Sequence, residues 1–322
     1  VLAALWFESL SAAIFLLLFL AIQSTAFGPA KYGMIPELMP EECLGRANGV
    51  ISMMTNLAII TGVIIGGLLS EGYPGSRAMP GLVMLGAAVS GYVASLFMEK
   101  LPARDPKSKV TANPMRPYLD TLKIMARRRY LLDIAIGLGF FGFIGIMVMQ
   151  AILDFKVLLN LSDRQASYLN VPIMLGVAVG SLTAGYLSKA KVRIGLVPIG
   201  ALGMALVLGI LGTHQLTTVR VVVGLVSMGF FGGFYVVPLE ALLQGRSPLE
   251  IRGRVQGTKA FLDFGLIALG GAAYKVLRGT LDLNVQMVLV LCSIITLVVA
   301  GYMFWSLRRY LKQRIGQILG SS

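Results

Sequence analysis

Nine apolar segments, each near or above the roughly 20 residues that cross a bilayer as an α-helix, make up most of this 322-residue sequence. Hydrophobic residues account for 56% of the chain and charged residues for 13%, against roughly 25% charged in a typical soluble domain. The solvent of such a chain must be lipid, where each backbone polar group needs an internal partner. The sequence therefore predicts an all-α membrane protein. The segments are residues 9–29, 47–69, 79–98, 131–154, 166–187, 195–213, 220–244, 257–278 and 285–307.

The Lys and Arg residues concentrate on one side of the membrane. When each is assigned to the nearest end of a segment, 22 of the 28 fall on one side, which also holds residues 100–130 and the end of the chain. The positive-inside rule makes this side cytoplasmic. We therefore expect a multi-pass protein of the cytoplasmic membrane with a cytoplasmic C-terminus. The net charge of +13 then reflects topology, and no nucleic-acid partner is expected.

A ten-residue string occurs twice: residues 40–49 read PEECLGRANG and residues 248–257 read PLEIRGRVQG. The two decapeptides agree at Pro, Glu, Gly, Arg and Gly with a constant offset of 208 residues. Each lies between two apolar segments, and such a parallel repeat predicts the two-bundle plan of a secondary transporter. We expect Gly45 and Gly253 to form tight turns, and Arg46 and Arg254 to begin the next helix at the cytoplasmic face. Besides Pro40 and Pro248, the matched residues are Glu42, Gly45, Arg46 and Gly49, and Glu250, Gly253, Arg254 and Gly257.

These matched turns have two interpretations. In one, they slide past each other when the bundles rock, and so take part in the conformational change. In the other, they are capped turns whose arginines only set the topology.

The repeat also predicts the domain organisation. The second decapeptide follows the fourth segment after residues 100–130, whereas the first follows the first segment of the chain, so we expect a twelve-helix plan whose first three helices precede Val1. Residues 117–130 are expected to form a short surface helix with Leu119, Leu122 and Met125 facing lipid. The predicted domains are the remainder of an N-terminal bundle (1–99), a basic cytoplasmic linker (100–130), a complete six-helix C-terminal bundle (131–307) and a basic cytoplasmic tail (308–322).

Two six-helix bundles joined by a basic loop is the plan of the major facilitator superfamily, and the decapeptides resemble its cytoplasmic turn motif. Three further strings resemble the bacterial lysophospholipid transporter family within it: PAKYG at 29–33, ANG at 47–49 and GGFYVVPLEALLQ at 232–244. This resemblance implies inward movement of lysophospholipids across the bacterial cytoplasmic membrane by alternating access. It also implies a cytoplasmic acyltransferase as a fused or associated partner. Glu240 departs from the family, which has a neutral amide there, so its role stays open.

A carrier of lysophospholipids needs a cation for the phosphate and an apolar wall for the single acyl chain. Lys31 stands where Pro29 and Gly33 are expected to interrupt a helix and free nearby backbone groups. The adjacent Tyr32 is suited to a hydrogen bond with a glycerol or phosphate oxygen. The alternative is that Lys31 reaches the membrane surface as an interfacial anchor.

Four more polar residues complete the predicted substrate site. Glu240 and Gln244 lie four apart, hence on one helix face, where they would meet the amine of an ethanolamine headgroup. The alternative for Glu240 is an ion pair with Lys259, which is itself expected to pair with Asp263. Asn56 and Gln150 lie within or at the ends of apolar segments, where hydrogen bonding between helices competes with ligand binding.

Other functions find little support in the sequence. His214 is the only histidine, and Cys43 and Cys292 lie far apart, so neither a metal centre nor a Ser-His-Asp triad is expected, and no cofactor is predicted. The phosphate-binding pattern GxxxxGK[ST] is absent, and so is the acyltransferase pattern HxxxxD, because Val219 follows His214 by five. The chain is therefore predicted not to be an enzyme. Two alternatives are a major-facilitator exporter of drugs or other small solutes and the membrane part of a phospholipid acyltransferase.

Overall fold

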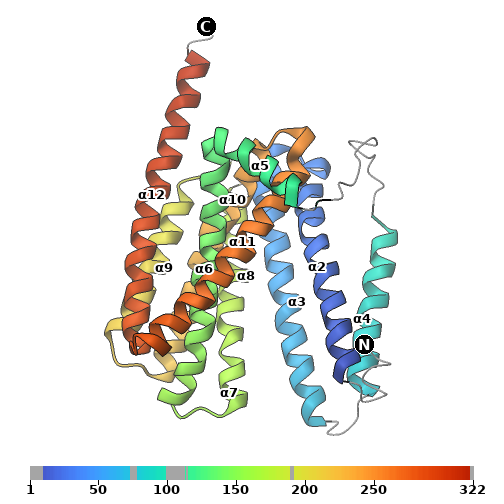
Figure 1. The fold of residues 1–322 in the computed structure, drawn as a ribbon, viewed down its shortest axis with the longest axis vertical. Helices are drawn as coiled ribbons and strands as arrows, with labels where there is room; N and C mark the ends of the chain where they lie inside the picture. The colour runs from blue at the N-terminus through green and yellow to red at the C-terminus, as the bar shows by residue number, and fades with distance from the viewer. Residues whose placement is uncertain (1–9, 73–77, 99–112, 114, 189–191, 320–322) are drawn as a thin grey trace.

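A computed structural model describes residues 10–72, 78–98, 113, 115–188 and 192–319, and within these ranges nine helices are long and apolar enough to cross a membrane. All nine predicted segments are therefore confirmed as helices, and Figure 1 shows them running up and down side by side. Residues 1–9, 73–77, 99–112, 114, 189–191 and 320–322 of the predicted domains lie outside the described residues. The long helices are α2 (Leu10–Leu38), α3 (Leu44–Gly72), α4 (Ala78–Leu96), α6 (Arg129–Leu158), α8 (Asn170–Leu187), α9 (Leu196–Thr213), α10 (Thr218–Arg246), α11 (Arg252–Lys275) and α12 (Val285–Leu319).

Short elements connect these helices. A helix of six residues, α7 (Asp163–Tyr168), precedes α8, and a π-helical turn (Val276–Thr280) follows α11. We call α2 to α4 the N-terminal half and α6 to α12 the C-terminal half; α4 and α2 lie at one side of the molecule and α9 and α12 at the other (Figure 1). The main hydrophobic core belongs to the C-terminal half and to the preceding helix α5 (Met115–Arg127), running from Met125 to Leu307. The predicted domain boundaries remain predictions.

The N-terminal half is much more exposed than the C-terminal half. Among the described residues of α2 and α4, most apolar side chains face outward, including Phe15, Phe19, Leu85 and Tyr92. Apolar side chains on this scale are compatible with lipid or with further helices as neighbours, not with water.

The two decapeptides adopt the same local structure. In each, a proline with extended backbone precedes a 3₁₀ turn (Glu41–Cys43 and Leu249–Ile251), and a long helix follows directly. The expected tight turns at Gly45 and Gly253 are wrong, because both residues lie inside the first turn of α3 and α11. The turn itself is made by Pro and the 3₁₀ residues. We call the end of the molecule that carries both turns, at the top of Figure 1, the turn end.

The predicted surface helix is present as α5 (Met115–Arg127), which crosses the turn end next to α11 (Figure 1). Leu119 is exposed, as expected for a lipid-facing residue, and Leu122 is half-buried. Met125 is fully buried in the main core, so its expected exposure to lipid is wrong. Tyr118 stacks on Phe261 with ring centroids 5.4 Å apart, which fastens α5 to α11 rather than leaving it on the membrane alone.

The two cysteines occupy unlike positions. Cys43 ends the first 3₁₀ turn and is half-buried, whereas Cys292 lies in the main core with its sulfur 3.7 Å from that of Met147. Both are free thiols.

Candidate functional site

A cavity of about 220 Å³ lies between α2 and α11, at the contact between the two halves. Its wall is apolar for the most part, with polar groups gathered on α11 and on the facing side of α2. A mixed lining of this kind is typical of a binding site for a small organic molecule. The lining residues are Ser24, Thr25, Gly28, Pro29, Tyr32, Gln256, Lys259, Ala260, Asp263, Phe264 and Ile267.

Helix α2 carries the first two predicted substrate residues. The expected interruption at Pro29 and Gly33 is wrong, because α2 continues as one helix from Leu10 to Leu38 with Pro29 inside it. Membrane helices tolerate proline, because neighbouring helices, Ser or Thr side chains and local adjustments of the helix satisfy the backbone groups that proline frees. Backbone groups freed by a break in the helix are therefore not what distinguishes the position of Lys31.

Lys31 extends from α2 into the N-terminal half instead of toward open solvent. Its Nζ donates a hydrogen bond of 3.2 Å to Thr55 Oγ1 on α3 and lies 5.0 Å from the centroid of the Tyr32 ring. The same ring has Lys259 Nζ of α11 at 5.5 Å from its centroid. The Tyr32 ring therefore has two ammonium groups near it, one from each half, and its π-system attracts both.

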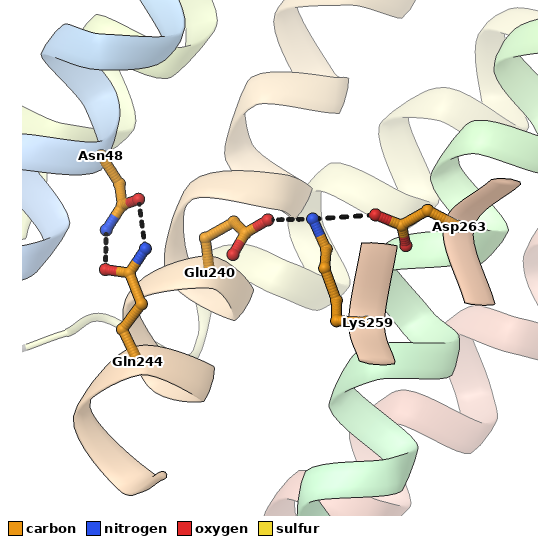
Figure 2. A network of polar contacts seen from close by, with 5 residues as sticks. All are labelled: Asn48, Glu240, Gln244, Lys259 and Asp263. Atoms are coloured by element: carbon orange, nitrogen blue, oxygen red, sulfur yellow. Dashed lines mark hydrogen bonds and ion pairs between the residues drawn. The ribbon is translucent and has the colours of Figure 1, made fainter. Parts of the chain in front are cut away.

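Three charged side chains form what we call the charge cluster: Glu240 on α10, and Lys259 and Asp263 on α11 (Figure 2). Lys259 Nζ contacts Glu240 Oε1 directly and lies 2.9 Å from Asp263 Oδ2. Of the two alternatives for Glu240, the ion pair with Lys259 is the one formed, and the expected pair of Lys259 with Asp263 is confirmed. Binding of a headgroup amine by Glu240 remains a prediction.

The side chains of the charge cluster are mostly buried, although they are charged. Glu240 is 4% exposed, and the side chain of Lys259 is 13% exposed. Among the described residues, Glu240 Oε2 and Asp263 Oδ1 are buried and accept no hydrogen bond, and Gln256 Nε2, which belongs to a residue lining the cavity, is buried without an acceptor. Unpaired polar atoms in a low-dielectric interior are costly, so this arrangement favours a ligand or proton that would pair them.

The predicted substrate residue Gln244 pairs with Asn48 of the other half. The two amides exchange two hydrogen bonds, Asn48 Nδ2 to Gln244 Oε1 at 2.7 Å and Gln244 Nε2 to Asn48 Oδ1 at 3.0 Å (Figure 2). Both side chains are buried. In this conformation the Gln244 amide joins α10 to α3, and its predicted contact with substrate remains a prediction.

Small residues bring α3 and α8 into close contact at the same level. A Cβ added to Gly49 would lie 2.6 Å from Ser181 O, and one added to Gly45 would lie 2.8 Å from Ser188 Cβ. Ser52 and Ser181 share a hydrogen bond of 2.8 Å. The glycines of the first decapeptide thus permit two backbones to approach, as small residues do between membrane helices.

Charged groups surround this contact at the surface. Glu41 Oε1 lies 3.2 Å from Arg246 Nη2, and the guanidinium of Arg46 lies 5.6 Å from the centroid of the Tyr186 ring on α8. Both contacts join the N-terminal half to the C-terminal half. Glu42 and Glu250, the matched acidic residues, are exposed.

The second decapeptide makes no comparably close contact. A Cβ at Gly253 would have no neighbour within 4 Å, and one at Gly257 would meet only Tyr118 Cε1 at 3.8 Å. Arg254 is exposed. The repeat is therefore one of local structure: the first copy packs its glycines tightly against the opposite half, whereas the second approaches α2 more loosely, with Gly253 near Gly33 and Gln256 lining the cavity.

Asn56 and Gln150, the remaining predicted substrate residues, donate hydrogen bonds to groups outside the charge cluster. Asn56 Nδ2 donates to Ser52 O in its own helix at 2.8 Å. Gln150 Nε2 donates to Gly271 O at 3.3 Å, so it joins α6 to α11, as the alternative to ligand binding expects. Among the described residues no group of three or more His, Cys, Asp or Glu side chains is arranged to hold a metal ion.

Comparison with known proteins places this geometry in a family. The sequence model described as the Major Facilitator Superfamily matches residues 1–271. The chain belongs to the major facilitator superfamily. The all-α membrane architecture of that superfamily agrees with the helices of Figure 1.

Among curated members of this superfamily, the chain is similar to lysophospholipid transporters. It is 30% identical over 237 residues to the Lysophospholipid transporter LplT of Shigella sonnei, covering 71% of this chain and 57% of the relative. It is 31% identical over 235 residues to the proteins of the same name from Salmonella paratyphi B and Salmonella newport, with the same coverage. The chain thus spans a little over half the length of these relatives.

Several residues at the site of this superfamily member were not predicted from the sequence. Asn48 entered only as part of the ANG string at 47–49, with no predicted partner, and Glu41 has no matched residue in the second decapeptide, where Leu249 stands. Thr55 carried no signal beyond being polar in an apolar segment, and Gln256 none beyond its place in the second decapeptide. Polarity inside a membrane span is the one pattern that would have selected them.

Proposed function

We propose that the protein carrying this chain moves lysophospholipids inward across the bacterial cytoplasmic membrane by alternating access. The observation that carries the proposal is the position of Lys31. Its ammonium is half-buried within the helices, hydrogen-bonded to Thr55 and next to the Tyr32 ring that lines the cavity. A cation held there, away from bulk water, suits the phosphate of a lipid headgroup.

The rest of the cavity suits the other parts of an amphiphile. Tyr32 and Gln256 offer an O–H and an unpaired N–H to glycerol or phosphate oxygens, while Phe264 and Ile267 offer apolar surface to the acyl chain. The names of the similar curated proteins support the same substrate class. Glu240, Gln244, Asn56 and Gln150 stay in the proposal as headgroup contacts of other conformations.

The conformation also fits a transport cycle. By the positive-inside rule the turn end is cytoplasmic, as is the end of α12. At the turn end the two halves are joined by the Asn48–Gln244 amide pair and the Glu41–Arg246 ion pair. We therefore assign this structure to a state closed toward the cytoplasm, and release of substrate requires these contacts to separate. A cytoplasmic acyltransferase, fused or separate, would then add the second acyl chain to the product.

The decisive experiment is uptake of labelled lysophosphatidylethanolamine by spheroplasts of a strain that lacks its own lysophospholipid transporter. Label that albumin no longer extracts counts as transported. We expect the intact protein to raise this fraction severalfold over the empty vector. Efflux of a cationic dye serves as the comparison for the alternative of a drug exporter, and efflux without lysophospholipid uptake would overturn the proposal.

A further inference from the structure

Two arginines lie at the turn end, where the span in α6 begins and the span in α12 ends. Arg129 is the first residue of the former and Arg309 the last residue of the latter, and α12 runs on past the turn end (Figure 1). Deeper in the membrane, Asp133 joins the two helices by accepting hydrogen bonds of 2.8 Å from Tyr302 and 2.6 Å from Ser306. Arg129 precedes Asp133 by four residues, and Arg309 follows Ser306 by three. Both arginines therefore lie about one helical turn beyond this contact, toward the membrane surface.

Aromatic side chains hold these two arginines at the level of the membrane surface. The guanidinium of Arg309 lies 5.5 Å from the centroid of the Trp305 ring, and that of Arg129 lies beside the Tyr302 hydroxyl. Tyr302 and Trp305 are both exposed, with ring centroids 6.3 Å apart. Tyr and Trp gather where hydrocarbon gives way to headgroups. The two cations therefore lie at headgroup depth.

The positive charge at this place is not balanced by acidic residues. Four exposed arginines gather at the ends of the two helices: Arg128, Arg129, Arg308 and Arg309. Among the described residues, none of the four forms an ion pair with a carboxylate. The adjacent carboxylate of Asp133 is 8% exposed and already accepts two hydrogen bonds from α12. The ends of α6 and α12 thus present excess positive charge to the membrane surface.

An exposed apolar stripe runs down α12 from these arginines. It consists of Leu291, Ile295, Val298, Tyr302 and Trp305, all exposed. Their spacing of four, three, four and three residues places them on one face of the helix. The hydrogen bond from Tyr302 to Asp133 puts this face beside α6, where Ile136, seven residues after Arg129, is also exposed. The stripe is about 21 Å long, which is more than the roughly 15 Å of hydrocarbon in one leaflet.

We propose that the seam between α6 and α12 binds a phospholipid of the cytoplasmic leaflet whose headgroup is anionic, as in phosphatidylglycerol or cardiolipin. Arg129 and Arg309 bind its phosphodiester, Arg128 and Arg308 add to the positive potential, and the stripe contacts an acyl chain. The turn end is cytoplasmic by the positive-inside rule. The seam lies at α12, away from the cavity between α2 and α11 (Figure 1), so the proposal does not depend on lysophospholipid transport.

The chemistry of the seam favours an anionic lipid over other occupants. A guanidinium binds the phosphate of any phospholipid. Ethanolamine adds an ammonium group, which the four neighbouring arginines repel, so a zwitterionic lipid gains less. An acidic protein segment would neutralise the arginines, but it would leave the stripe below headgroup depth uncovered. An anionic lipid meets the charge and the apolar stripe together.

The test uses the fluorescence of Trp305 in the intact protein, with every other tryptophan, Trp6 among them, replaced by phenylalanine. The protein is reconstituted in bilayers of phosphatidylethanolamine and phosphatidylglycerol, with one of the two brominated in its acyl chains so that it quenches tryptophan on contact. Comparing the two labelled bilayers gives the relative affinity of the two lipids for the surface around Trp305. We expect a preference for phosphatidylglycerol of about fivefold or more, because each arginine near the surface contributes roughly that factor. Brominated cardiolipin in a third bilayer distinguishes a site for two phosphates, which prefers cardiolipin, from a site for one, which does not.

Charge variants assign the preference to its residues. The double variant Arg129→Gln/Arg309→Gln should bind the two lipids nearly equally, whereas Arg129→Lys/Arg309→Lys should keep most of the preference. The matched control is Arg116→Gln/Lys123→Gln, which removes two exposed cations from α5 at the same end of the molecule. This control should keep the preference in full. If the double Gln variant does not fold, Arg309→Gln alone takes its place and should lower the preference about fivefold.

Three results would overturn the lipid site. Equal quenching by both lipids in wild type would leave the arginines to an acidic protein partner. An unchanged preference in the Gln variants would separate lipid selection from Arg129 and Arg309. A preference lowered as much by the α5 control would assign it to the overall charge of the surface.

Discussion

The amides of Asn48 and Gln244, which are 196 residues apart in the chain, exchange two hydrogen bonds across the contact between the halves. Each amide donates one hydrogen bond to the other and accepts one from it, so that the two bonds close a ring. Both side chains are buried, so separating the halves exposes or orphans four polar atoms at once. The pair therefore stabilises the closed turn end as a unit.

The losses of stability from replacing the two members of this pair should not add. Asn48→Leu leaves the buried Gln244 amide without its partner, and Gln244→Leu leaves Asn48 Oδ1 without its donor while Asn48 Nδ2 keeps its bond to Leu44 O. We expect either change to cost about 1–3 kcal/mol in stability. The double variant should lose less than the sum of the two, which a double-mutant cycle on thermal unfolding in detergent would measure. Asn170→Leu is the control, because Asn170 donates only to Ser167 O, three residues away. Strictly additive losses would contradict the paired arrangement.

Gly49 and its repeat partner Gly257 should respond oppositely to alanine. A Cβ at Gly49 meets the backbone of α8 at 2.6 Å, so Gly49→Ala should separate α3 from α8 and cost about 1–3 kcal/mol. A Cβ at Gly257 meets nothing closer than 3.8 Å, so Gly257→Ala should be neutral or stabilising by up to about 1 kcal/mol through helix propensity. Thermal unfolding of both variants checks the contrast. Equal effects would mean that the two decapeptides pack alike.

Lys31 should be replaceable by another cation but not by an apolar or acidic residue. Loss of one desolvated, charge-assisted contact with phosphate would weaken binding by roughly 1.5–3 kcal/mol, or about 10- to 150-fold. We therefore expect Lys31→Ala and Lys31→Glu to abolish most uptake of labelled lysophosphatidylethanolamine, and Lys31→Arg to retain more. Uptake is normalised to the amount of protein in the membrane. Wild-type rates for Lys31→Ala would remove Lys31 from the proposed site.

Lys259 should be the most damaging single residue to remove from the charge cluster. Lys259→Met leaves Glu240 and Asp263 buried without their shared cation, and breaking a buried ion pair in this way costs about 3–5 kcal/mol. Combining it with Glu240→Gln and Asp263→Asn should restore much of this loss, since no uncompensated charge then remains. Thermal unfolding of the single and triple variants measures both effects. A triple variant as unstable as the single one would show that Lys259 acts through packing instead.

The elements set by local sequence were predictable, and the contacts set by the angle between the halves were not. All nine spans follow from their apolar length, and the Lys259–Asp263 pair follows from four-residue spacing on one helix face. For Glu240 the sequence left two roles open, headgroup binding and an ion pair with Lys259, because Lys259 lies on another helix. Asn48 with Gln244 and Gly49 with Ser181 depend on how α3 approaches α8 and α10, which no periodicity encodes.

The errors have the same origin. Pro29 and Gly33 suggested a broken helix from rules that hold in water, and Met125 was assigned to lipid from helix periodicity alone. For Met125 the packing of neighbouring helices decided the outcome. Glycine at position 45 was interpreted as a turn former, but its use is the close approach of Ser188.

The unlike settings of the two cysteines make this chain its own reporter. Cys43 adjoins Leu44, which is 1% exposed in the contact between the halves, while Cys292 is sealed in the main core. A thiol-reactive fluorophore should therefore attach selectively to Cys43, with no engineered residue in the chain. Its emission would report in real time whether the turn end is exposed to water, so that opening could be timed relative to the binding of lipid.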